Sequence, residues 1–208
     1  PRGCAKIPAM PARHFVIQEL GDALAAVHAA GRLTRFGVDG VDSAGKTRLA
    51  DEMAQELTTR GRPAVRISLD QFERPPAERY ARGELSPEGF YLDSFDLERF
   101  RAHALSIEMP VEASVVCDGV FLHRPELADL WDVSIFVDAD LEIAAQRGAE
   151  RNLVWTDSLD ATHERFRTRY MPAQRRYIEE QRPHERATFV VENTRLDLPE
   201  LVRNSRGP

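Results

Sequence analysis

The chain has 208 residues, with 42% hydrophobic and 30% charged side chains, a formal net charge of −6 and a pI near 5.6. This length suits one hydrophobic core better than two, and the acidic balance argues against a general nucleic-acid or anionic-membrane binder. No segment approaches the roughly 20 apolar residues that span a bilayer, and no cleavable leader opens the chain, so we expect a cytoplasmic protein. Cys4 and Cys117 are too few for a disulfide framework, and Cys117 lies in an apolar run that predicts a buried thiol.

The chain begins with a segment that we interpret as a tail and continues with a helix. Residues 1–13 are rich in Pro and small residues without periodicity, which favours a tail or an expression remnant in front of one domain over residues 14–208. An apolar stripe with helical spacing then runs from Phe15 to Val27 and ends at Gly31.

Strand and helix patterns alternate along the rest of the chain. Apolar runs of strand length cover residues 32–39, 64–70, 113–119, 133–139 and 187–193. Helical patterns cover residues 49–61, 94–105 and 141–151, and an Arg-rich helical stretch, interrupted at Pro172, covers residues 159–181. This alternation predicts an α/β fold of three layers, in which a mostly parallel five-stranded sheet is covered by helices on both faces.

A glycine loop lies between the first predicted strand and the next predicted helix. Gly40, Gly45, Lys46 and Thr47 match the pattern G-x-x-x-x-G-K-[ST], whose backbone N–H groups surround phosphate oxygens at a helix N-terminus. Lys46 would reach the β and γ phosphates of a nucleotide, and the Thr47 hydroxyl would ligate Mg²⁺, whereas the alternative is a tight glycine-rich turn without a ligand. The loop alone does not separate kinases, ATPases and GTPases. The predicted nucleotide-binding loop consists of Gly40, Val41, Asp42, Ser43, Ala44, Gly45, Lys46, Thr47 and Arg48.

Aspartates follow three predicted strands, at positions 39, 70 and 118. Ligands of open parallel sheets bind at the carboxyl ends of the strands, where these side chains would lie. Asp118 could serve as a Walker-B acid that approaches Mg²⁺ directly or through water, or it could only initiate the turn at Gly119. Asp70 could accept the proton of an attacking hydroxyl, or it could form an Asx-turn.

Several segments in this order resemble one family of enzymes. The segments VDGVDSAGKT, SLDQF, RYARGELSPEGFYLDSFD and CDGVFLHRPEL, with a later R-x-x-x-R, resemble the uridine kinase-like branch of the P-loop kinases, related to phosphoribulokinase and bacterial pantothenate kinase. The likeness covers residues 34–193 and looks strongest to proteins of high-GC actinobacteria. It implies a P-loop NTPase fold, an Arg-rich helical lid at residues 147–171, ATP and Mg²⁺ as cofactors, and a small-molecule hydroxyl as the phosphate acceptor.

The resemblance also implies roles for individual residues. Asp70 matches the base for the acceptor hydroxyl, and Asp93 matches an aspartate that holds sugar hydroxyls, although Asp93 could instead cap the following helix. Arg147 and Arg151 match lid arginines that clamp ATP phosphates, with an ordinary salt-bridged helix as the alternative. We therefore expect Asp70, Lys46 and Arg151 to be the catalytic residues.

Further acceptor-binding candidates lie in and after a long loop. Residues 74–91 lack a core pattern, and loops of this length inside a compact domain are more often functional than inert. Arg82, Tyr91 and His123 are candidate acceptor ligands, with a packing role as the alternative for the tyrosine and the histidine. A mixed spacing favours a solvated face for most of Arg165, Arg167 and Arg169.

The leading hypothesis is an ATP-dependent kinase whose acceptor is a nucleoside such as uridine or cytidine. Well-studied uridine kinases insert a β-hairpin before the Walker-B strand for base recognition, whereas only residues 101–112 separate helix and strand here. Either the acceptor is not a pyrimidine nucleoside, or the hairpin belongs to the full protein and is not represented in this chain. The alternatives are another hydroxyl acceptor, such as pantothenate, a sugar or a secondary metabolite, or an inactive nucleotide-binding regulatory module. We expect no nucleic-acid or membrane partner, and a homo-oligomer is compatible with the sequence.

Overall fold

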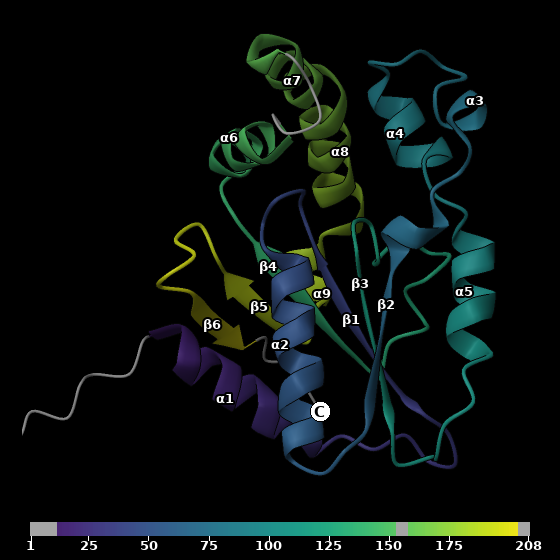
Figure 1. Ribbon diagram of the computed structural model, residues 1–208, viewed down its shortest axis with the longest axis vertical. Helices are drawn as coiled ribbons and strands as arrows, with labels where there is room; N and C mark the ends of the chain where they lie inside the picture. Colours follow the sequence, from purple (N-terminus) through teal and green to yellow (C-terminus); the bar gives the residue numbers. More distant parts are fainter. Residues whose placement is uncertain (1–11, 153–157, 204–208) are drawn as a thin grey trace, which may run out of the picture.

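Six strands form one sheet in the order β2-β3-β1-β4-β5-β6 in the computed structural model, which describes residues 12–152 and 158–203 (Figure 1). The strands are β1 (Thr34–Gly40), β2 (Ala64–Ser68), β3 (Ser114–Gly119), β4 (Val133–Asp138), β5 (Phe189–Glu192) and β6 (Glu200–Arg203). β1 to β5 are parallel, and β6 pairs antiparallel with β5. The five predicted strands are confirmed, while the sixth, ELVR, was missed because two apolar residues between charged ones form no apolar run of strand length.

Helices cover both faces of this sheet and its carboxyl end. They are α1 (Ala12–Ala25), α2 (Lys46–Thr59), α3 (Pro76–Arg79), α4 (Pro87–Asp93), α5 (Leu97–Leu105), α6 (Leu141–Asn152), α7 (Leu159–Arg165), α8 (Met171–Gln181) and α9 (Pro183–Arg186). Because α1 begins at Ala12, and Arg13 forms a 2.6 Å ion pair with Glu52 of α2, the expected tail is shorter than residues 1–13. Residues 153–157 of the expected lid lie outside the described residues.

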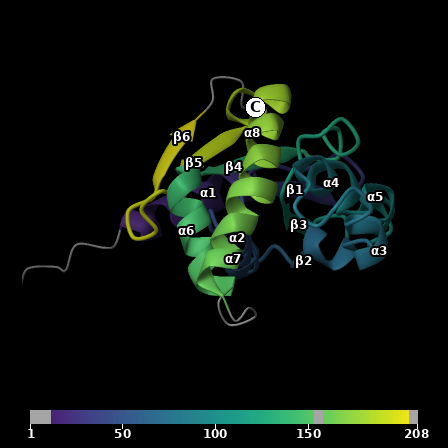
Figure 2. The same cartoon turned by 90° about the horizontal axis from the view of Figure 1, so that it is seen from above.

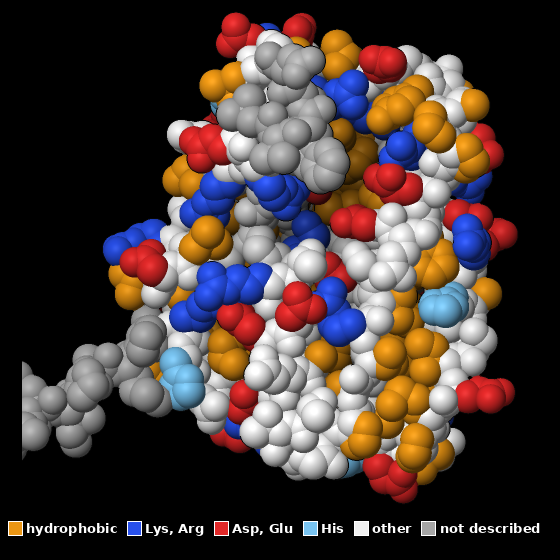
Figure 3. All heavy atoms as spheres, viewed as in Figure 1, with side chains coloured by type: hydrophobic (Ala, Val, Ile, Leu, Met, Phe, Trp, Pro, Cys, Tyr) orange, Lys and Arg blue, Asp and Glu red, His pale blue; other side chains and the backbone are white. Residues whose placement is uncertain are grey.

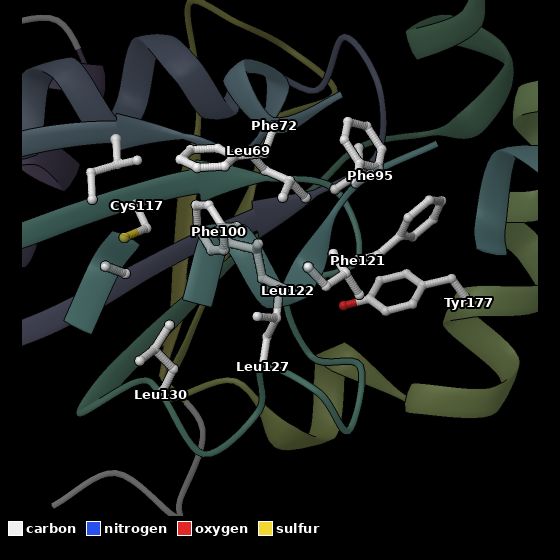
Figure 4. Packing of buried hydrophobic residues seen from close by; sticks show 14 of the residues in the cluster. Leu69, Phe72, Phe95, Phe100, Cys117, Phe121, Leu122, Leu127, Leu130 and Tyr177 are labelled. Atoms are coloured by element: carbon white, nitrogen blue, oxygen red, sulfur yellow. The ribbon is translucent and has the colours of Figure 1, made fainter. Parts of the chain in front are cut away.

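Two cores form because successive residues of the central strands point to opposite faces. Val115 and Cys117 of β3 pack toward α4, α5 and α8, while Val116 packs toward α1 and α2. Figure 4 shows the first core, in which Phe100 of α5 and Tyr177 of α8 lie on the same side of the sheet. Full burial of one such apolar side chain contributes roughly 1.5–3 kcal/mol to stability. Cys117 is buried as predicted, and this burial raises the pKa of its thiol to about 12.

Two element boundaries differ from the sequence prediction and affect the position of acidic residues. The predicted strand 64–70 ends at Ser68, and a 3₁₀ turn (Leu69–Phe72) follows it, so Asp70 lies in this turn. The predicted helix 94–105 begins only at Leu97, where the side chain of Asp96 accepts the N–H of Arg99 as the cap. The capping alternative for Asp93 is therefore wrong, because Asp93 is the last residue of α4.

The Arg-rich stretch predicted at residues 159–181, called the lid segment from here on, is helical from Leu159 to Gln181, without the break expected at Pro172. A π-helical turn (Phe166–Tyr170) joins α7 to α8 immediately before this proline. Proline lacks an N–H and crowds the preceding turn, and the wider π turn accommodates both effects. The helices α6, α7 and α8 lie over the carboxyl end of the sheet, and α3 and α4 lie at the same end, on the side of β2 and β3 (Figures 1 and 2).

Residues 106–113, between α5 and β3, contain no strand, in agreement with the missing hairpin. Within the two described ranges, no helix is both long enough and apolar enough to cross a membrane.

Candidate functional site

The glycine loop connects the end of β1 to the start of α2 and closes tightly on its neighbours. Gly40 and Gly45 have φ angles of +155° and +98°, which side chains rarely adopt. A Cβ atom would lie 2.4 Å from the Val137 carbonyl at Gly40 and 2.7 Å from the Asn193 amide at Gly45. The buried Ser43 hydroxyl has no hydrogen-bond partner among the described residues. The glycines are therefore needed for conformation and space, and the loop offers a polar group for a ligand.

A pocket of about 260 Å³ opens at this loop. Six of its lining residues belong to the loop and the first turn of α2, and the other two are Asp70 and Arg151. The ammonium of Lys46 donates to the Val41 carbonyl at 2.8 Å, so it is held inside the loop. The structure thus brings together the three residues that we expected to be catalytic, which come from three separate elements.

Asp70 presents an exposed carboxylate to this pocket, and no hydrogen bond to that carboxylate is found within the described residues. Partial enclosure by the crevice raises the pKa of Asp70, and the charge of Asp118 adds to this effect, while Lys46 and Arg151 oppose it. The Asx-turn alternative is not observed, because the Asp70 carboxylate accepts no backbone N–H within the described residues, whereas the backbone N–H of Asp70 donates to the Ser68 hydroxyl at 3.4 Å. Asp70 is placed to interact with a ligand in the pocket.

The two expected metal ligands are in direct contact. The Thr47 hydroxyl donates to Oδ2 of Asp118 at 2.7 Å, and the Asp118 side chain is almost fully buried. Arg66 of β2, which the sequence analysis did not single out, forms a 2.7 Å ion pair with Oδ1 of Asp118 and also contacts Asp51. A hydroxyl and a carboxylate are ligands that suit Mg²⁺, but an arginine at the same carboxylate competes with a cation.

The two expected lid arginines lie at different places. Arg151 lines the pocket at the glycine loop, whereas Arg147 donates to the carbonyl oxygens of Asn193 and Thr194 after β5. The salt-bridge alternative does not describe Arg147, because its hydrogen-bond partners among the described residues are carbonyl groups. Figure 3 shows basic side chains gathered on this face of the molecule, around the upper part of α2.

The candidate acceptor ligands separate into an exposed pair and buried residues. Arg82 and Asp93 form a 2.7 Å ion pair with each other at the surface. Tyr91 is buried, its hydroxyl donates to Glu180 at 3.1 Å, and burial raises the pKa of this hydroxyl. The structure therefore shows that the Tyr91 ring packs in the core and is not exposed to a ligand.

His123 is also buried, at the carboxyl end of the sheet. Nδ1 of its ring lies 2.6 Å from Asp39, and Nε2 lies 3.0 Å from the Ser134 hydroxyl. Its backbone N–H donates to Tyr177 at 3.0 Å. Because both ring nitrogens have protein partners, the structure corrects the expectation that this side chain faces an acceptor.

Arg169 is the buried member of the three arginines, for most of which we expected a solvated face. Its side chain is only 2% exposed, and it donates to the carbonyl oxygens of Glu84 and Ser86 at 3.1 Å and of Arg79 at 3.3 Å. Its guanidinium also lies 4.9 Å from the ring centre of Tyr80. Arg167 is exposed as expected, whereas Arg169, together with an ion pair of Arg165 with Glu84 at 3.7 Å, connects the loop before α4 to the lid segment.

A second, larger pocket of about 1000 Å³ lies between this loop and the lid segment. Its walls include Glu73, Arg79 and Leu85 on one side and Arg165, Phe166 and Tyr170 on the other. Glu73 follows Asp70 by three residues, and the Tyr170 hydroxyl interacts electrostatically with Asp42 of the glycine loop. The two pockets are therefore neighbours.

Two amides that carried no local sequence signal hold the glycine loop. Asn193 donates to the Ala44 carbonyl at 2.6 Å. Gln174 of α8 accepts the N–H of Asp42 at 3.1 Å and donates to its carboxylate at 2.7 Å. Both residues lie far from the loop in sequence, so only the fold reveals these contacts.

Comparisons with known proteins agree with this arrangement. No family model matches the sequence. A curated relative named uridine kinase, from Leuconostoc citreum, is 30% identical over 143 residues, which cover 57% of this chain and 68% of the relative. A possible uridine kinase from Bacillus stearothermophilus has a TM-score of 0.66 at 22% identity, covering 86% of this chain and 98% of that chain. A candidate fructose transport system kinase from Silicibacter has a TM-score of 0.66 at 21% identity, covering 79% and 95%.

The sheet order and the glycine loop define a P-loop nucleotide-binding fold. The identity and coverage of the curated relative show that the chain belongs to the uridine kinase-like P-loop kinases. The two solved structures support the fold.

Proposed function

We propose that this protein is an ATP- and Mg²⁺-dependent kinase that transfers the γ-phosphoryl group to a hydroxyl of a small metabolite, with uridine or cytidine as the first candidates. The observation that carries the proposal is the pocket lined jointly by Lys46, Asp70 and Arg151. Phosphoryl transfer requires mainly positioning and charge neutralisation, and these cationic groups and this carboxylate supply both beside the P-loop.

In this proposal, the loop N–H groups and Lys46 bind the terminal phosphates, and Arg151 neutralises charge from the lid. Thr47 and Asp118 would hold Mg²⁺, which when bound would offset charge on the phosphate oxygens. The direct contact between these two oxygen ligands, together with the unpartnered Ser43 hydroxyl among the described residues, supports the fit.

Asp70 acts as the general base. The acceptor oxygen attacks the γ-phosphorus, its proton moves to the Asp70 carboxylate, and the bond between the γ-phosphorus and the bridging oxygen breaks to leave ADP. A raised pKa makes this carboxylate a stronger base than an ordinary aspartate, which supports the assignment.

We place the acceptor in the larger pocket between the loop before α4 and the lid segment, within one domain. The aromatic rings of Phe166 and Tyr170 offer a stacking surface, and Glu73 offers an acceptor for hydroxyl groups. The Arg82 and Asp93 pair lies in the same loop region and could exchange its internal ion pair for contacts with a polar ligand. A nucleoside has both an aromatic face and several hydroxyl groups.

A different small hydroxyl compound is the second candidate acceptor. The absence of a strand within residues 106–113 favours it, because this connection has no hairpin that could contact a pyrimidine base. Pantothenate and sugars belong to this class.

The test is acceptor-dependent release of ADP from ATP and Mg²⁺, measured with uridine, cytidine, other nucleosides, pantothenate and sugars, against reactions without acceptor. We expect one class of acceptor to stimulate ADP release strongly. Stimulation by uridine or cytidine supports the first candidate, and stimulation by another compound supports the second. Tight ATP binding without stimulation by any acceptor would instead favour a regulatory module.

Arg66 gives a prediction about the metal dependence. Its guanidinium lies 2.7 Å from Asp118, so Arg66→Gln removes a positive charge that competes with Mg²⁺. We expect the Mg²⁺ concentration at half-maximal ADP release to fall several-fold, on the order of 1 kcal/mol for a partly solvated charge. Arg101→Gln, which removes an arginine paired with the exposed Asp129, should leave this concentration unchanged. A higher Mg²⁺ requirement in Arg66→Gln would mean that Arg66 orients Asp118 for the metal.

A further inference from the structure

Helix α8 contacts the start of the phosphate loop at two points. Gln174 and Tyr177 are three residues apart, so they lie on the same helix face, and both are almost fully buried. Gln174 reaches Asp42 within the loop, and Tyr177 reaches Asp39 at the end of β1. The helix therefore contacts both ends of the four-residue stretch that leads into the nucleotide pocket.

The contact of Gln174 uses both ends of its amide. Oε1 accepts the backbone N–H of Asp42 at 3.1 Å, while Nε2 donates to Oδ2 of Asp42 at 2.7 Å. A glutamine can make both bonds at once, whereas a carboxylate at this position could accept but not donate. This pair of bonds fixes the direction of the Asp42 side chain as well as its backbone.

Asp42 is placed where a change of its position affects the nucleotide. It lines the same pocket as Lys46, Asp70 and Arg151. Burial raises the pKa of Asp42, and the charges of Lys46 and Arg151 oppose this effect. A carboxylate in this place competes with terminal phosphates for the two cations, so its orientation influences the affinity for ATP.

The second contact, between Tyr177 of α8 and Asp39, fixes the position of α8 relative to the start of the loop. Oδ1 of Asp39 accepts the N–H of Gly40 at 2.8 Å, and Oδ2 contacts the Tyr177 hydroxyl and the His123 ring. The same continuous helical segment carries Tyr170 and Phe166 in the wall of the larger pocket. Side chains of one rigid element thus line the larger pocket and hold the phosphate loop.

Building on the proposed function, we propose that Gln174 is a positioning residue that couples the lid helix to the phosphate loop by orienting Asp42. The hydrogen bond between Gln174 Nε2 and Asp42 Oδ2 can be removed by a substitution at residue 174. A second substitution, at residue 42, can then restore it with the donor on the other side. Gln174→Glu removes the donor and places two carboxylates together. Asp42→Asn combined with Gln174→Glu restores a donor and acceptor pair with the donor on the loop, at the same net charge as the native pair.

The test measures ATP binding by calorimetry without acceptor, so it does not depend on phosphoryl transfer. At pH 8 we expect Gln174→Glu to weaken ATP binding about tenfold, since a hydrogen bond to a charged group is lost and a like charge is added. The Asp42→Asn and Gln174→Glu double variant should regain most of the ATP affinity that Gln174→Glu loses relative to the native protein. Gln55→Glu, at an exposed position of α2, is the matched control and should bind ATP normally.

A pH series separates the coupling from general damage. Two adjacent carboxylates share a proton as the pH falls, so Gln174→Glu should approach native affinity near pH 5.5, with the native protein measured in parallel. This reference is necessary because Lys46, Asp70 and Arg151 face Asp42 from three elements, and the Tyr170 hydroxyl interacts with it from the π turn. Gln174→Met loses both hydrogen bonds without adding charge, and its weaker binding should not recover at low pH.

Native affinity of Gln174→Glu at pH 8 would overturn the proposal. So would failure of the double variant to regain ATP affinity when Asp42→Asn alone binds ATP. If Gln174→Glu does not fold, the comparison of Gln174→Met with the double variant decides between the same outcomes. Absence of ATP binding in the native protein would instead contradict the proposed function itself.

Discussion

Asp70→Asn is expected to lower acceptor-dependent ADP release by roughly 10²- to 10⁴-fold, the usual contribution of a general base. The substitution keeps the size and shape of the side chain but removes the group that accepts the proton. Because the Asp70 carboxylate accepts no hydrogen bond from the described residues, its loss should leave the surrounding pocket intact. ATP affinity, measured separately, should therefore stay close to that of the native protein.

The pH dependence gives an independent check on Asp70. Its carboxylate must be ionised to act as a base, so kcat/KM of the native protein should fall as the pH drops through its pKa. Since enclosure in the crevice raises this pKa, the fall should begin at higher pH than an ordinary aspartate would give. Asp129→Asn, at an exposed loop position, is the matched control and should behave as the native protein. Lost ATP affinity with normal turnover in Asp70→Asn would reassign Asp70 to nucleotide binding.

The parts of the site that could be predicted from sequence are encoded locally. The glycine loop is contiguous, and its spacing between a strand and a helix is itself the signal. Asp70 and Asp118 were found because parallel strands bring their carboxyl ends to one edge, so alternation of elements is enough to place them together. The contact between Thr47 and Asp118 and the shared pocket of Lys46 and Asp70 agree with this reasoning.

The parts that could not be predicted depend on side-chain packing between distant elements. Gln174 and Asp42 are separated by 132 residues, and nothing near either residue indicates the pairing. Arg66 lies in an edge strand, where a charged residue is ordinarily a solvated one, and only the fold brings it to Asp118. The burial of Arg169 depends on carbonyl oxygens of a loop 83 to 90 residues earlier in the chain, and nothing near Arg169 in the sequence indicates these partners.

Asp39→Ala is expected to lower the free energy of unfolding by about 3 to 5 kcal/mol, because several buried groups lose their shared acceptor and each unsatisfied group costs about 1 to 3 kcal/mol. The Asp39 side chain is fully buried, and its carboxylate contacts three groups: the Gly40 N–H, Nδ1 of His123 and the Tyr177 hydroxyl. Its truncation leaves the Tyr177 hydroxyl and the His123 ring without their acceptor and also opens a cavity. Urea denaturation followed by circular dichroism measures the change.

Two control substitutions separate the effect of breaking the buried hydrogen-bond network from the effect of losing a carboxylate. Ser134→Ala removes only the hydroxyl that contacts His123 Nε2, and it should cost about 1 kcal/mol, as for one hydrogen bond. Asp129→Ala removes an exposed carboxylate and should stay within about 0.5 kcal/mol of the native protein. Because Asp39 accepts the N–H of Gly40, the Asp39→Ala variant should also bind ATP more weakly than its remaining folded fraction predicts. Stability within about 1 kcal/mol of the native value would show that His123 and Tyr177 satisfy each other without Asp39, since their hydroxyl and ring nitrogen lie 3.3 Å apart.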